Sequence, residues 1–241
     1  MFIQVAMTNR VTNRTYLTQA LLLPGLICWL VSSAASRLHA QGTVNYTIRF
    51  TGLIVAHVYG PEAPDPTVVK VGNTASETPS GTQTYTGALL MGSGWSAQLF
   101  AANGPGQLES SLSPVGTSVT SFRTGATLGG TIATSIQNIP SVPLGGTGTF
   151  QLRVWDNLGG TVTEWALAEP LWLNGNIAAG KSIVFDIESL GTPLTPPADM
   201  VNFRSFNTYW IPEPETWTLI FFGGSALLAS RRGRRCLFKS P

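Results

Sequence analysis

Residues able to carry out acid–base or nucleophilic chemistry are sparse between positions 41 and 210. This stretch holds one histidine, His57, and no cysteine, because Cys28 and Cys236 lie outside it. A cysteine–histidine pair is therefore impossible there, and a serine–histidine–acid triad would have a single candidate base. His57 falls in the apolar run 53–59, a setting typical of a structural residue on a strand, and no Gly-x-Ser-x-Gly turn accompanies it. We expect that the protein is not an enzyme.

Carboxylates and metal ligands give no stronger signal. Glycoside hydrolysis needs two opposed carboxylates, whereas Asp186 and Glu188 share one face of an expected strand and are predicted to be solvated. A zinc site built from histidine and cysteine is excluded, because residues 41–210 hold too few of these ligands. Asp156 and Asn157, together with that pair, could offer oxygen ligands to calcium, but no loop with ligand spacing is present. We predict no metal and no cofactor.

Tryptophans are the other candidate functional residues. Exposed indoles in line on a β-sheet can hold sugar rings, although most tryptophans are packing residues. Two or more indoles on one exposed face would indicate a carbohydrate-binding module, and acids converging in a pocket would indicate an enzyme. The candidate glycan contacts are Trp95, Trp155, Trp165 and Trp172.

The elements that must position these residues have the period of β-strands. Val44, Tyr46, Ile48 and Phe50 alternate with polar residues, which predicts a half-buried strand. No segment between residues 41 and 210 keeps an amphipathic helical period over three turns, and turn residues are frequent. We predict an all-β domain, an antiparallel β-sandwich of jelly-roll or Ig-like type. Further short strands are expected near 53–59, 96–101, 119–123, 131–136, 149–155, 183–188 and 201–206.

Charge is distributed unevenly along the chain. Residues 41–210 hold six basic and ten acidic residues, a formal charge of −4, whereas the last eleven residues alone hold five basic ones. The central stretch has no lysine–arginine cluster that could neutralise several phosphates at once. We therefore expect no binding to nucleic acid.

The first forty residues have the three parts of a secretory signal peptide. Basic residues precede an apolar run from about 20 to 31, and small residues lead to Ala40. The run is about a dozen residues long, and a membrane span needs about twenty. We place cleavage between Ala40 and Gln41, with a cut after Ala35 as the alternative and Met7 as an alternative start. The expected partners are the secretion translocon and signal peptidase.

The last thirty residues form a second candidate targeting signal. Pro212, Glu213 and Pro214 make an extended, exposed strip, since proline fixes φ and donates no backbone hydrogen bond. Residues 216–230 follow as a single transmembrane helix of about 22 Å, against the roughly 30 Å hydrocarbon core. Its predicted anchor residues are Trp217, Leu219, Ile220, Phe221, Phe222, Leu227 and Leu228, and the basic cluster that sets topology is Arg231, Arg232, Arg234 and Arg235.

This order of Pro-Glu-Pro, short apolar run and arginines resembles the sorting domain of PEP-CTERM proteins. The resemblance covers about thirty residues. It departs from the pattern at Glu215, where a small hydroxyl residue is common, and at residues 236–241, which extend past the arginines. It implies processing by an exosortase-like membrane enzyme that recognises the strip 212–214.

The domain organisation that follows is a signal peptide over 1–40, an extracytoplasmic domain over 41–210 and a sorting tail over 211–241. The expected path is export, an inner-membrane-anchored precursor, and then the cell surface or the extracellular matrix. We expect a structural or adhesive role. The alternative is a carbohydrate-binding module whose partner is surface exopolysaccharide.

Overall fold

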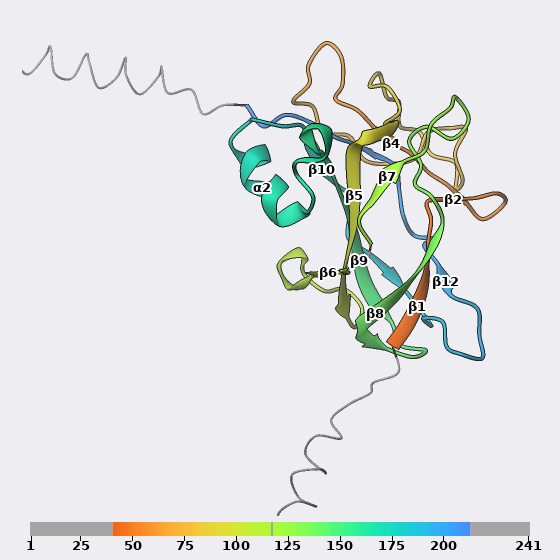
Figure 1. Cartoon of the computed structure of the whole chain (residues 1–241). Coiled ribbons are helices and arrows are strands. Elements are labelled where there is room, and N and C mark those ends of the chain that lie inside the picture. The colour runs from red at the N-terminus through yellow and green to blue at the C-terminus, as the bar shows by residue number, and fades with distance from the viewer. Residues whose placement is uncertain (1–40, 117, 213–241) are drawn as a thin grey trace, which may run out of the picture. The chain divides into compact units, whose positions relative to one another are not determined.

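The computed structural model describes residues 41–116 and 118–212. The chain divides into two units between Ala40 and Gln41, and all described residues belong to the second unit. Their regular elements are mostly strands, with one α-helix and several sheets (Figure 1). The all-β prediction is confirmed at this level. The expected signal helix and transmembrane helix lie outside the described residues, and within them no helix is long and apolar enough to cross a membrane.

The first sheet has three strands in the order β12-β1-β8, which are Ala198–Asp199, Gln41–Tyr46 and Ser135–Pro143. In β1 the side chains of Val44 and Tyr46 are fully buried, as the period of two predicts. β8 pairs antiparallel with β1, but β12 pairs with it in parallel. A second parallel pair joins β4 (Val58–Tyr59) to β13 (Phe206–Asn207), so these two short pairs depart from the predicted antiparallel arrangement.

The second sheet has six strands around β5 (Gly92–Asn103) and β9 (Gly148–Asp156), which pair antiparallel along the whole of β9. Its flanking strands are β6 (Ser113–Pro114), β7 (Thr120–Phe122), β10 (Ala179–Lys181) and β11 (Phe185–Ile187). β9 is buried on both faces from Gly148 to Trp155. The alternation of apolar and polar residues in 149–155 predicted only one buried face.

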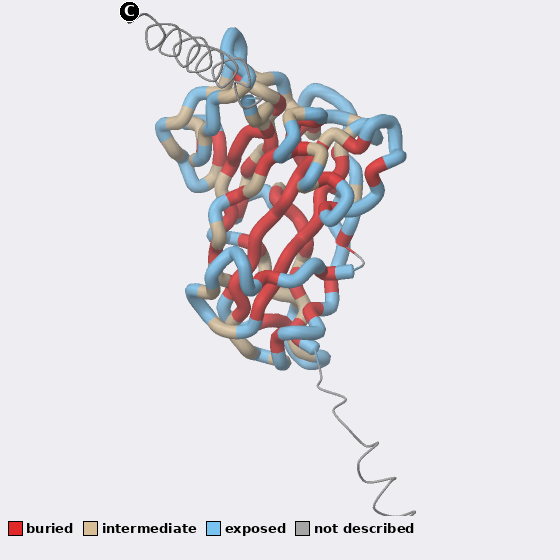
Figure 2. Tube along the Cα trace, turned by 90° about the vertical axis from the view of Figure 1, so that its left-hand side faces the viewer, coloured by how far each residue is buried: buried red, intermediate tan, exposed pale blue. Residues whose placement is uncertain are grey.

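The first buried face of β9 belongs to the main core. Phe150, Leu152 and Val154 meet Leu99 of β5 and Val44 of β1 there, so that both sheets contribute to one apolar interior. Figure 2 shows this buried region running lengthwise through the middle of the domain, with exposed loops at the ends.

The second face of β9 is covered by the helix α2 (Trp165–Leu173), which sequence patterning did not predict. The helix follows the short turn η2 (Leu158–Gly160), and η1 (Glu109–Ser111) lies in the loop before β6. Helix α2 has only nine residues and is apolar on nearly every side, so no amphipathic period marks it.

Residues 60–91 are mostly irregular, and isolated bridges and side-chain hydrogen bonds hold them. The small pair β2 (Arg49–Phe50) and β3 (Ile54–Val55) precedes this segment. Buried Glu62 accepts hydrogen bonds from the Thr86 backbone and hydroxyl, and pairs with the Lys70 ammonium at 2.5 Å. The described chain begins at the lower end of Figure 1 and finishes at the opposite end, beside α2.

Candidate functional site

The four candidate tryptophans do not form an exposed platform. Trp155, Trp165 and Trp172 are buried, and Trp95 is partly buried against the main core. Their rings pack edge to face in series, with centroids 6.1 Å apart for Trp155 and Trp165 and 5.7 Å apart for Trp165 and Trp172. Tyr209 continues the series 5.1 Å from Trp172. The ring faces of the three buried tryptophans are used in packing and are not available to a sugar.

The buried indoles belong to a charged and aromatic cluster on the second face of the six-stranded sheet. The Arg153 guanidinium on β9 lies 3.9 Å from the centroid of the Phe100 ring and 5.5 Å from that of Trp165. Lys181 on β10 is paired directly opposite Arg153, and its ammonium lies 5.4 Å from both Trp165 and Trp172. Two cations therefore share one aromatic surface.

Two carboxylates offset the electrostatic repulsion between Arg153 and Lys181. Lys181 Nζ lies 2.7 Å from Glu109 Oε1 and 3.1 Å from Glu169 Oε1, and Arg153 reaches Glu109 at 3.8 Å. Burial acts to raise the pKa of Glu109, but hydrogen bonds from Lys181 and Gln151 and the nearby positive charges outweigh it and lower that pKa below 4.5. The cluster borders an open hollow of about 420 Å³.

The chemistry of this cluster is that of a neutral ion-pair network. A glycosidase general acid needs a raised pKa and a free path to the scissile oxygen. Glu109 has the opposite pKa shift, and both it and Glu169 hold the same ammonium. Arginine and lysine stems packed on aromatic rings instead stabilise the sheet face.

His57 takes part in a second polar network, centred on Glu77. Its Nδ1 lies 2.7 Å from Glu77 Oε1, and the Tyr59 hydroxyl donates to the same oxygen at 3.1 Å. The Thr74 backbone N–H donates to the other oxygen at 2.6 Å, and the His57 backbone N–H donates to the Ser205 hydroxyl at 2.9 Å. His57 therefore lies in a contact that joins residues 57–59, 74–77 and 205, which agrees with a structural role.

The predicted pair Asp186 and Glu188 separates into two environments. The Asp186 carboxylate accepts hydrogen bonds from the Gly106 N–H at 3.1 Å and from Thr149 Oγ1 at 2.6 Å, so it fixes the loop after β5. Glu188 is exposed. Only Glu188 fits the predicted solvated face.

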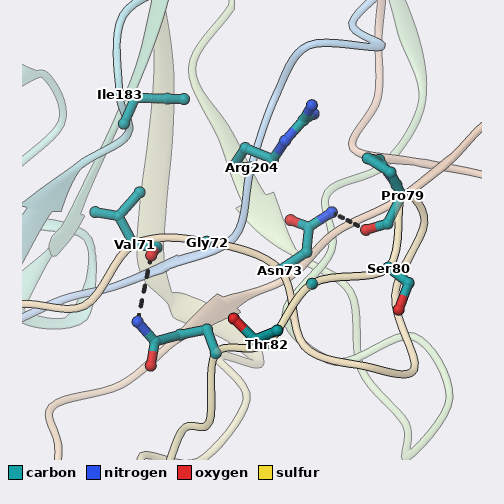
Figure 3. Close-up of a pocket in the computed structure, with 10 residues that line it drawn as sticks. Val71, Gly72, Asn73, Pro79, Ser80, Thr82, Ile183 and Arg204 are labelled. Carbon is teal, nitrogen blue, oxygen red and sulfur yellow. Dashed lines mark hydrogen bonds between the residues drawn. The ribbon is translucent and has the colours of Figure 1, made fainter.

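A second hollow, of about 430 Å³, lies between two loops and was not predicted (Figure 3). Asn73 closes part of it by donating to the Pro79 carbonyl at 2.7 Å. Arg204 lies on another wall and donates only to backbone carbonyls, those of Val201 and Phe203, among the contacts of the described residues. The hollow is also lined by Gly72, Ser80, Thr82, Gln83 and Ile183. No sequence motif marks these residues, because the chain brings them together from positions 71–83, 183 and 204.

The other sequence-predicted sites fall at or beyond the limits of the described chain. Gln41, the expected first residue after cleavage, is the first residue of β1 and pairs with Pro143. Pro212 is the last described residue and is exposed. Glu213, Pro214, the anchor residues and the arginine cluster lie outside the described residues, as does Ala40.

Comparison with known proteins adds no relative: no family model, no curated protein and no solved structure matches this chain.

Proposed function

We propose that the chain is an exported surface protein, carried to its destination by a signal peptide and a PEP-CTERM-like tail, whose β domain has a structural or adhesive role. One observation carries the proposal. Three elements occur in fixed order directly after the folded domain: the strip 212–214, the apolar run 216–230 and the arginines of 231–235. Such an order is far more specific than a hydrophobic run alone.

The limits of the folded domain support this organisation. β1 begins at Gln41, so cleavage after Ala40 leaves every β1 pairing with β8 and β12 intact. At the other end, Ile211 still packs against the aromatic cluster while Pro212 is exposed. Processing within 212–214 would therefore leave the core of the domain unchanged.

The domain itself supports a passive role better than a catalytic one. Its buried ionisable side chains, such as Glu62, Glu77 and Arg153, are engaged in networks that fix loops and strands. We further propose that the two larger sheets form the layers of a β-sandwich, because side chains from both meet in the main core.

A sorting test follows from the tail. Changing Pro212, Glu213 and Pro214 to alanine should leave the protein in the membrane fraction, whereas the wild type reaches the cell surface or the medium. The matched control changes Pro196 and Pro197, two prolines of the loop before β12, and should be sorted like the wild type. Equal release of the wild type and the 212–214 variant would contradict recognition of this strip.

A second candidate function is association with surface polysaccharide. The hollow in Figure 3 is a better candidate for its binding site than the tryptophans are. Arg204 and Thr82 present polar groups there without using buried ring faces. Arg204→Ala should weaken retention on the host's purified polysaccharide, and Arg123→Ala should not. Equal retention of both variants would remove this candidate.

A further inference from the structure

The outward side of α2 is apolar, which is unusual for a helix at a protein surface. Trp165, Ala168 and Trp172 face the core. The opposite side consists of Ala166, Leu167, Pro170 and Leu173, all exposed, and we name these four residues the outer stripe of α2. Leu167 is 48% exposed and Leu173 is 56% exposed. A surface helix normally places polar residues at such positions.

The only charged side chain within α2 does not cover the outer stripe. Glu169 is turned toward Lys181, with which it forms an ion pair at 3.1 Å. An exposed apolar stripe on a domain with many polar loops indicates a contact surface. The partner of the outer stripe can be inferred from the segments that lie next to α2.

The end of the described chain lies directly beside α2. The Trp172 indole N–H donates to the Tyr209 carbonyl at 3.1 Å, and Ile211 packs against the cluster beneath the helix. Figure 1 shows the last, blue segment of the domain passing beside α2. The outer stripe and the departure point of the tail therefore share one end of the domain.

The sequence after Pro212 limits how far this end can lie from the tail's apolar run. Only residues 213–215 separate Pro212 from Thr216, so the two are at most about 14 Å apart even in a fully extended chain. A domain tethered this closely must present the surface around Pro212 to the membrane that the run enters. Trp210, which is partly exposed there, is a residue type that favours the membrane interface.

We infer that the outer stripe of α2 inserts into the lipid interface and seats the domain on the membrane while the tail is uncleaved. The inference rests on the proposed insertion of residues 216–230. Its physical basis is the removal of Leu167, Pro170 and Leu173 from water at a position that the short tether already holds near the bilayer. Cleavage of the tail would end the tethering and release this contact.

The test uses residues 41–241, the form expected after signal cleavage, with Cys236 changed to serine and an environment-sensitive NBD fluorophore on Leu173→Cys. The matched control carries the fluorophore on Leu194→Cys, a 95% exposed leucine in the loop that pairs near β1, at the other end of the domain. Both proteins are incorporated into vesicles of phosphatidylethanolamine and phosphatidylglycerol. Flotation reports insertion of the tail, and quenching by spin-labelled lipid reports contact of the fluorophore with the bilayer.

We expect both proteins to float, with blue-shifted and lipid-quenched emission at position 173 and water-like emission at position 194. Flotation with water-like emission at both positions would overturn this inference and leave the proposed anchoring intact. Failure to float would overturn both. Blue-shifted emission at position 173 without lipid quenching would show that protein, such as the tail segment, covers the stripe, and would also overturn the inference.

Discussion

Replacing Glu77 with alanine is expected to lower the free energy of unfolding by about 3–5 kcal/mol, because its buried carboxylate accepts hydrogen bonds from several donors that would lose their partner. The Glu77 side chain is only 2% exposed, and its carboxylate accepts hydrogen bonds from His57, Tyr59 and the Thr74 N–H. Each buried donor left without a partner costs about 1–3 kcal/mol. Water can reach the partly exposed His57 ring, which keeps the total within that range.

Glutamine at position 77 should cost less, about 1–2 kcal/mol, because it preserves the shape of the side chain. Its oxygen can still accept from the Thr74 N–H, and its amide lies within reach of the His57 ring nitrogen and the Tyr59 oxygen. The comparison therefore separates lost hydrogen bonds from lost charge.

The assay is urea denaturation of the purified protein, followed by near-ultraviolet circular dichroism of its buried tryptophans. Glu188→Ala is the control, since an exposed glutamate should change stability by no more than about 0.5 kcal/mol. A Glu77→Ala variant within about 1 kcal/mol of the wild type would refute the network reasoning. Equal losses for alanine and glutamine would refute the argument from shape.

Two further predictions concern acid stability and chain packing. Burial acts to raise the pKa values of Glu62 and Glu77, but hydrogen bonds from Lys70 and Thr86 to the first, and from His57 and Thr74 to the second, lower them below 4.5. The native state then binds fewer protons than the unfolded chain, so this stabilisation is complete above about pH 4.5 and is lost as the pH falls through the lowered pKa values. Thermal unfolding between about pH 6 and pH 3 should show the loss only below about pH 4.5, and a loss already complete at pH 5 would contradict the assignment. Gly87→Ala should cost about 1–3 kcal/mol in the urea assay, because a Cβ there would lie 2.2 Å from the Gly60 carbonyl oxygen. Gly94→Ala meets no heavy atom within 4 Å, and equal costs at the two positions would contradict the steric explanation.

β9 illustrates how far the sequence predicts the fold. The alternation of Phe150, Leu152 and Val154 with Gln151 and Arg153 correctly predicted a strand with its apolar face in the core. It did not predict burial of the polar face, because α2, a helix without an amphipathic period, covers that face from outside the strand.

The candidate sites show the same limit. Burial of Trp155, Trp165 and Trp172 follows from tertiary packing, and residue type alone could not distinguish it from an exposed platform. The Glu77 network and the hollow at Arg204 join residues more than a hundred positions apart, so no local motif could identify either. Prediction succeeded where the signal was local, as for the strands at 96–101 and 149–155, and failed where distant segments meet. Two expected strands were also wrong: 131–136 is a strand only from Ser135, and 201–206 only at Phe206.

The intact mass of the protein recovered from the cell surface and medium of its native host tests the proposed sorting most directly. We predict a species that begins at Gln41 and ends within 212–214, beside a membrane-bound species with an intact tail in the variant whose residues 212–214 are alanine. Retention of residues 216–241 in the wild type as well as the variant would contradict processing at the strip and would indicate a protein that is simply anchored in the membrane.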